Sequence, residues 1–95
     1  MEFTNLKFSG HAIKRMFERR ISRNDVVEAI KKGEILQEYP DDRPFPSEVI
    51  YFMADTRPLH VVVGYHAPSG TAVVITVYEP GPDLWTSDYK RRRKP

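Results

Sequence analysis

The sequence has 95 residues, of which 40% are apolar and 12% aromatic, so it can fill one hydrophobic core and is too short for several domains. It has no cysteine, which excludes disulfides and thiolate zinc sites, and no apolar run of about 18 residues, which excludes a membrane-spanning helix. The N-terminus lacks the basic and apolar regions of a secretory signal, so we expect a cytoplasmic protein.

The charge is unevenly distributed along the chain. Residues 1–23 contain six Lys/Arg and two Asp/Glu, and residues 24–89 contain four Lys/Arg and eleven Asp/Glu. Residues 90–94 contain five Lys/Arg and no Asp/Glu. Clustered cations attract the phosphates of nucleic acids, whereas an acidic segment fits a basic partner. We therefore expect one domain, residues 1–88, followed by a basic tail, residues 89–95, that is disordered when unbound.

Two amphipathic helices are predicted near the N-terminus. Ser9 fits the N-cap of the first helix, which runs to about Arg20, and Ser22 fits the N-cap of the second, which Gly33 ends. Because a short turn separates them, we expect a helical hairpin. In the first helix the apolar side chains share one side, which we expect to face the core: Ala12, Ile13, Met16 and Phe17.

After Glu34 the pattern favours strands. Runs rich in β-branched residues predict strands over residues 35–39, 49–53, 59–65 and 72–78, separated by proline- and glycine-containing turns. The fold class is therefore α+β, with the helical hairpin packed on an antiparallel sheet of three to four strands. Alternation places one set of side chains toward the helices: Leu59, Val61, Val63 and Tyr65 in one strand, and Val73, Ile75 and Val77 in the next. The opposite, open face then carries His60, Thr76 and Tyr78, with Tyr78 across the hairpin from His60.

The polar side of the first helix is cationic. His11, Arg15 and Arg19 recur at i, i+4 and i+8, so their side chains form one stripe along which a polyanion could lie. A charged outer face is also ordinary for a surface helix, and Glu18 can pair locally with these arginines. RNA binding and simple solvation therefore both stay open for this stripe.

Several short motifs resemble a bacterial family of small single-domain proteins labelled as a domain of unknown function. The most specific is the HAxxRMxERxI run that begins at His11, after Ser9-Gly10; the others lie at residues 39–42, 57–61, 75–78 and Trp85. That family is similar to the RelE/ParE-like toxins of type II toxin–antitoxin systems, near the BrnT and MqsR types. The resemblance implies a RelE/ParE-like fold and a metal-independent endoribonuclease that cleaves messenger RNA. It also implies a protein antitoxin, often of a zinc-finger type, but it assigns no individual catalytic residue.

Metal-free RNA cleavage needs a base for the 2′-hydroxyl, an acid for the leaving 5′-oxygen and cations near the phosphate. The candidate catalytic residues are His11, His60, Tyr78 and Arg57. The candidate RNA-binding residues are Arg15, Arg19, Arg91, Arg92 and Arg93. We expect the helix and one border of the sheet to bring His11, Arg15, His60 and Arg57 into a single groove. The spacing of histidines and carboxylates predicts no metal site, and we expect no cofactor.

Two alternatives stay open beside the enzyme. One is a module of the same fold that binds RNA, the ribosome or a protein without chemistry, and the other is a toxin that inhibits gyrase. The acidic middle of the chain is a candidate surface for the antitoxin, through Asp41, Asp42 and Glu48.

Overall fold

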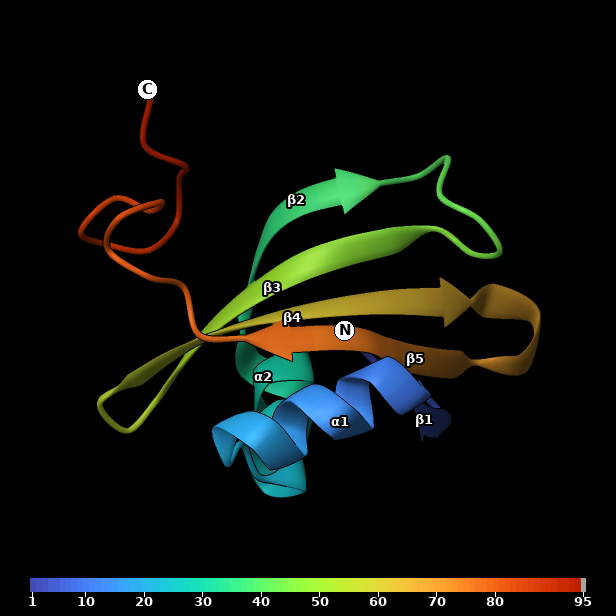
Figure 1. The fold of residues 1–95 in the computed structure, drawn as a ribbon. Coiled ribbons are helices and arrows are strands. Elements are labelled where there is room, and N and C mark those ends of the chain that lie inside the picture. The colour runs from blue at the N-terminus through green and yellow to red at the C-terminus, as the bar shows by residue number, and fades with distance from the viewer. Residues whose placement is uncertain (95) are drawn as a thin grey trace.

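The computed structural model describes residues 1–94 and shows two helices on one face of a five-stranded sheet (Figure 1). The strands are β1 (Asn5–Phe8), β2 (Glu34–Tyr39), β3 (Ser47–Ala54), β4 (Arg57–His66) and β5 (Thr71–Tyr78), in the order β1-β5-β4-β3-β2. The helices are α1 (Gly10–Arg19) and α2 (Arg23–Lys32), and a 3-10 turn, η1 (Ala67–Ser69), joins β4 to β5. The predicted α+β class is confirmed.

Both helices begin at the predicted serines. Ser9 Oγ accepts a hydrogen bond from the amide of Ala12, and Ser22 Oγ accepts one from the amide of Asp25, each at 3.0 Å. These bonds satisfy amide groups that have no partner within the helix. α1 packs on β5, and α2 packs on β3 and β4, so the helices cover neighbouring parts of the same sheet face.

The prediction of three to four antiparallel strands is wrong, because the sheet gains a fifth strand that runs parallel to its neighbour. β1 pairs in parallel with β5, with Asn5 opposite Thr71 and Phe8 opposite Val74. Leu6 and Phe8 also pack against the core. A segment of four residues is too short to show a clear alternation of apolar and polar residues. The strand β1 can therefore be recognised only from its pairing with β5.

A β-bulge in β5 changes which of its side chains face the helices. Val61 pairs with Val77 and Val63 with Val74, so β5 contains one residue more than β4 between these pairs. The alternation therefore shifts within the strand. Of the predicted inward set Val73, Ile75 and Val77, only Val77 is in the core, together with Ala72 and Val74. In β4 the predicted inward residues Leu59, Val61 and Val63 are fully buried.

The orientation of α1 also differs from the prediction. Ala12 is fully buried and Met16 packs against the core, as predicted, whereas Ile13 and Phe17 are exposed. The Ser9 hydroxyl bonds the carbonyl of Ile75 at 2.8 Å, and the Arg19 guanidinium reaches the carbonyl of Val77 at 3.5 Å. These contacts fasten both ends of the helix to β5, and the small Ala12 side chain allows the close approach.

The chain after β5 folds back over the sheet face that the helices leave free (red in Figure 1). We call residues 84–93 the C-terminal loop. A bridge between Trp85 and Arg92 closes it, with backbone hydrogen bonds from Thr86 to Arg91 and from Arg93 to Leu84. The structure places the predicted basic tail in this loop, with backbone hydrogen bonds at Tyr89, Arg91 and Arg93, and Pro95 lies outside the described residues. Trp85 packs on a buried histidine of β4 and so connects the loop to the sheet.

Candidate functional site

His60 lies at the centre of the open sheet face, beneath the C-terminal loop. It comes from β4, and its cross-strand neighbours are Tyr51 of β3 and Tyr78 of β5. The rings of Tyr51, Tyr78 and Trp85 each make an edge contact with the imidazole, with centroids 6.1, 5.2 and 4.4 Å away. These contacts leave His60 with no exposed surface. The open face predicted for His60 is therefore correct, although the loop covers the residue.

The hydrogen bonds of His60 determine where its proton lies. Nε2 is 2.6 Å from the carbonyl oxygen of Tyr89, which can only accept, so Nε2 carries the hydrogen. In the neutral ring Nδ1 then accepts a hydrogen bond from the hydroxyl of Tyr78 at 3.1 Å. Burial lowers the pKa of His60, and the bond to the Tyr89 carbonyl opposes that shift only in part. The imidazole is therefore neutral at neutral pH and holds an acceptor toward Tyr78.

Tyr78 connects this buried histidine to the surface. Its side chain is half-buried and lines a groove on the open face. Burial raises the pKa of the Tyr78 phenol, while the nearby Arg92 cation acts in the opposite direction. Tyr78 is thus a neutral phenol that donates a hydrogen bond to His60, and its side chain lines the groove. The three groups form a chain of hydrogen bonds, from the Tyr78 hydroxyl to Nδ1 of His60 and from Nε2 of His60 to the Tyr89 carbonyl.

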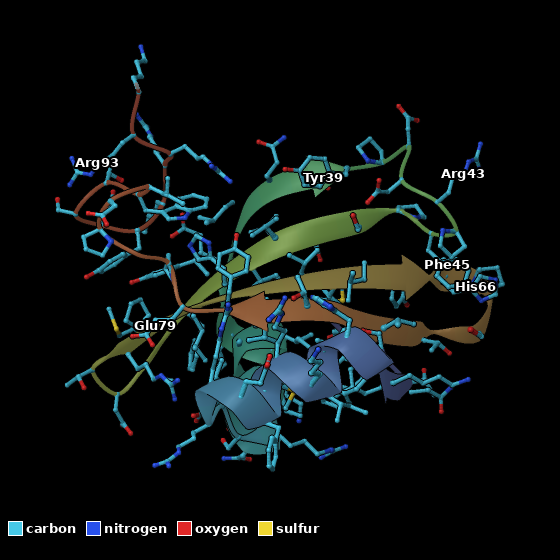
Figure 2. The ribbon with its side chains drawn as sticks, in the orientation of Figure 1. Tyr39, Arg43, Phe45, His66, Glu79 and Arg93 are labelled. Carbon is cyan, nitrogen blue, oxygen red and sulfur yellow. The ribbon has the colours of Figure 1, made fainter. Side chains whose placement is uncertain are left out.

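The groove has a volume of about 440 Å³ and joins the C-terminal loop to β2 and β5. Its residues are aromatic, cationic or uncharged, and none is acidic: Leu36, Gln37, Tyr39, Val49, Tyr78, Trp85, Lys90, Arg91 and Arg92. Figure 2 shows Tyr39 on β2 and Arg93 on the C-terminal loop, both on the side of the sheet away from the helices. The combination of ring faces and cations is typical of surfaces that bind single-stranded nucleic acid.

The cations of the groove differ in how far they are engaged within the protein. The ammonium of Lys90 is 3.0 Å from a carboxylate oxygen of Glu34, and the hydrogen bond between them raises the pKa of Lys90. The Arg92 guanidinium lies 5.5 Å from the centre of the Trp85 ring, in cation–π contact. Arg91 is exposed and is in no ion pair with any residue between 1 and 94. Arg91 and Arg92 are therefore the cations free to meet a phosphate.

The structure separates the predicted site residues into two groups. His60, Tyr78, Arg91 and Arg92 lie together on the open face, and Arg93 lies near them on the same loop. His11, Arg15 and Arg19 belong to α1, which packs on the other face, and Arg15 is paired with Glu18 at 3.1 Å. The prediction of a single groove between α1 and the sheet border is therefore wrong, because β4 and β5 lie between the two groups.

Arg57 lies at the C-terminal end of α1, away from His60, and its guanidinium is bonded within the protein. One of its terminal nitrogens donates to the carbonyl of Arg20 at 2.8 Å, the other donates to the carbonyl of Arg19, and Nε donates to Glu79 at 3.2 Å. All three guanidinium nitrogens are thus engaged within the protein. They satisfy carbonyls at the C-terminal end of α1 and join that end to β4.

Of the aromatic residues of the groove, Tyr39 and Trp85 were absent from the candidate site residues named from the sequence, as was the carbonyl of Tyr89. Both side chains occur in the motifs that carry the family resemblance, and Trp85 was too large to leave exposed, but neither observation indicates which surface they cover. Their place follows from the path of the C-terminal loop across the sheet.

Within residues 1–94, no group of three or more His, Asp or Glu side chains is arranged to hold a metal ion. Neither of the two helices found there has the length and apolar character required to cross a membrane.

Comparison with known proteins gives one match. Residues 8–79 match a protein family described as "Domain of unknown function (DUF4258)", a range that includes both helices, His60 and Tyr78 but not the C-terminal loop. No curated protein matches the chain, and no solved structure matches it.

Proposed function

This chain belongs to the family described as Domain of unknown function (DUF4258), and we propose that it cleaves messenger RNA without a metal ion, as the toxin of a type II toxin–antitoxin system. The resemblance to RelE/ParE-like toxins supports the biological class. The observation that carries the chemistry is the hydrogen bond from Tyr78 to the buried, neutral His60, at a groove lined by two arginines that form no ion pair within residues 1–94.

The proposed reaction begins with a proton relay. The 2′-hydroxyl of a nucleotide in the groove gives its proton to the Tyr78 oxygen, while the Tyr78 proton moves to Nδ1 of His60. The resulting imidazolium is stabilised by its hydrogen bond from Nε2 to the Tyr89 carbonyl. His60 is therefore the base, and Tyr78 is the group that touches the substrate.

The 2′-oxygen then attacks the adjacent phosphorus. A bond forms between them and the bond to the 5′-oxygen breaks, which leaves a 2′,3′-cyclic phosphate and a 5′-hydroxyl that takes its proton from a water molecule. The hydroxide formed takes up the relayed proton from His60 through the Tyr78 hydroxyl, which restores the neutral imidazole. Negative charge grows on the phosphate oxygens during this step. Arg91 and Arg92 are the groups that would stabilise it, by charge-assisted hydrogen bonds.

The test is RNA cleavage by Tyr78→Phe in the presence of EDTA. Tyr78→Phe keeps the ring and removes the relay, so we expect cleavage to fall at least about a hundredfold. Tyr39→Phe is the matched control, because it removes a phenol from the same groove that is not bonded to His60. Cleavage by Tyr78→Phe at the wild-type rate, with folding verified by circular dichroism, would reject this mechanism.

A second candidate is a non-catalytic module that binds RNA, the ribosome or a protein. It is favoured by the complete burial of His60, because both imidazole nitrogens are already bonded within the protein and could serve only to anchor the loop. Such a module would shift the mobility of RNA and leave it intact. A gyrase inhibitor of this fold would also leave RNA intact, and would block supercoiling by gyrase.

The biological part of the proposal has a separate test in cells. Expression of the chain alone should stop growth, and the product of the adjacent gene should restore it by acting as the antitoxin in the cytoplasm. Growth that continues at full rate, with the protein present and folded, would contradict the toxin assignment.

A further inference from the structure

α1 presents apolar side chains to solvent on the side of the protein away from the groove. Phe17 is 86% exposed and Ile13 is 57% exposed. They are four residues apart, so they lie one turn apart on the same outward face of the helix. Amphipathic surface helices normally turn this stripe toward the core. Here the hydrogen bonds that hold α1 on β5 leave Ile13 and Phe17 exposed to solvent.

The surface beside these residues has two shallow, open hollows. The two hollows meet at Met16, which lines both. The smaller, of about 290 Å³, is lined by Phe8, Ile13, Met16 and Arg23. The larger, of about 660 Å³, is lined by Met16, Phe17, Glu18, Arg20, Ile21 and Ser22. We call this surface the α1 surface. Its hollows can receive side chains from a partner.

The charge around the α1 surface is positive. Arg20 and Arg23 each border one hollow, and the Arg23 guanidinium lies 5.7 Å from the centre of the Phe8 ring. Within the described part of the chain, residues 1–94, neither arginine is in an ion pair. The one acid of the surface, Glu18, is already paired with Arg15. A partner would therefore supply the negative charge.

We propose that the α1 surface binds an amphipathic helix of another protein, with apolar side chains one turn apart and acidic side chains beside them. The apolar pair fills the two hollows next to Met16, and the acids meet Arg20 and Arg23. This proposal rests on the exposure and charge of α1 alone, so it does not depend on the proposed ribonuclease activity.

Two other occupants fit the same surface less well. In a two-fold dimer a second copy would bring its own Arg20 and Arg23 against this patch, and like charges would repel. A bilayer of anionic lipids would attract the arginines, but a flat surface does not fill hollows on either side of Met16. The acidic helix satisfies both the shape and the charge.

The test uses two designed helical peptides of about 18 residues, long enough to populate a helix in water. Both carry leucines one turn apart, and the flanking positions are Glu in one peptide and Lys in the other. Titrated into the isotope-labelled full chain, the Glu peptide should shift the amide resonances of α1 and of residues 21–23. Its Kd should rise at least about tenfold in Phe17→Ala and in the double variant Arg20→Gln/Arg23→Gln.

Leu84→Ala is the matched control, because Leu84 is as exposed as Ile13 but lies on the C-terminal loop; it should bind the Glu peptide as the wild type does. Equal binding of the two peptides, shifts confined to another surface, or no binding at all would overturn the proposal. Binding to phosphatidylserine vesicles that is lost in Phe17→Ala would overturn it in favour of a membrane. A wild-type dimer that Phe17→Ala dissociates would overturn it in favour of self-association.

Discussion

Replacing the two free arginines of the groove tests whether RNA lies along the open sheet face. Five cations occupy residues 90–94, but they are not equivalent. Lys90 is paired with Glu34, and Nε of Arg93 donates to the carbonyl of Pro82 at 2.7 Å. Arg91 and Arg92 line the groove without an ion pair among the described residues. The double variant Arg91→Gln/Arg92→Gln therefore removes the two contacts to phosphate that the structure favours.

The expected effect is a change in the salt dependence of RNA binding. Each phosphate contact on a single strand contributes about 0.7 to the slope of log K against log salt concentration, so the loss of two lowers the slope by about 1.4. Between about 50 mM and about 200 mM salt, the wild type should then lose about sevenfold more affinity than the double variant. A basic tail that binds RNA without a defined groove would spread this effect over all five cations.

Fluorescence anisotropy with a labelled single-stranded 2′-O-methyl RNA measures this slope, because that RNA has no free 2′-hydroxyl to be cleaved. Arg20→Gln/Arg23→Gln is the control, since it removes the same charge from the opposite side of the protein. We expect the control to keep the wild-type slope to within about 0.3, well below the change from two contacts. An equal change in both double variants would mean that net charge, and not the groove, determines binding, and would refute the reasoning.

Three further predictions concern the fold around the site. Because burial lowers the pKa of His60 below its ordinary value of 6.5, the unfolded chain takes up this proton first as the pH falls. The free energy of unfolding, measured with urea at a series of pH values, should thus decrease as the pH falls below 6.5 through the folded-state pKa, and His60→Gln should lose this dependence. Arg57→Gln should lower the free energy of unfolding by about 1–2 kcal/mol, because carbonyls at the end of α1 lose their donor. The rate of RNA cleavage by the folded Arg57→Gln variant should stay within about threefold of the wild-type rate, because the loss of a general acid or base would lower it by at least about a hundredfold. Gly33→Ala should cost about 1–3 kcal/mol in thermal denaturation, because its Cβ would lie 2.4 Å from Cγ2 of Ile50. A stable Gly33→Ala variant would mean that the end of α2 can move away from β3.

Features set by neighbouring residues were predictable from the sequence. The serine N-caps depend on bonds that span three residues, and both are present. The alternation in β4 is likewise local, and it places His60 correctly on the face away from the helices. Alternation also predicted Tyr78 on this face, but its pairing with His60 depends on the bulge, because the register that starts at His66 and Thr71 would otherwise place Val77 opposite His60.

Features that depend on distant contacts were not predictable in the same way. β1 exists because a segment near the N-terminus pairs with β5, about sixty residues later. The bulge in β5 is visible only from its register with β4. The helical period shows that α1 has an apolar side, but whether that side faces the sheet depends on how Ser9 and Arg19 attach the helix to β5. The separation of His11 from His60 follows from these long-range contacts.

The candidate site combines residues inside the range that matches the family with residues beyond that range. His60 and Tyr78 lie inside residues 8–79, the range that matches the family, whereas Trp85, Arg91 and Arg92 lie beyond it. In the proposed mechanism His60 and Tyr78 transfer the proton, and Arg91 and Arg92 bind the phosphates. The two parts of the chain meet at His60, where the bond from Nε2 to the carbonyl of Tyr89 fixes the tautomer and the Trp85 ring packs on the imidazole. The chemistry of the sheet therefore depends on the position of the loop, because the loop supplies both contacts to the histidine.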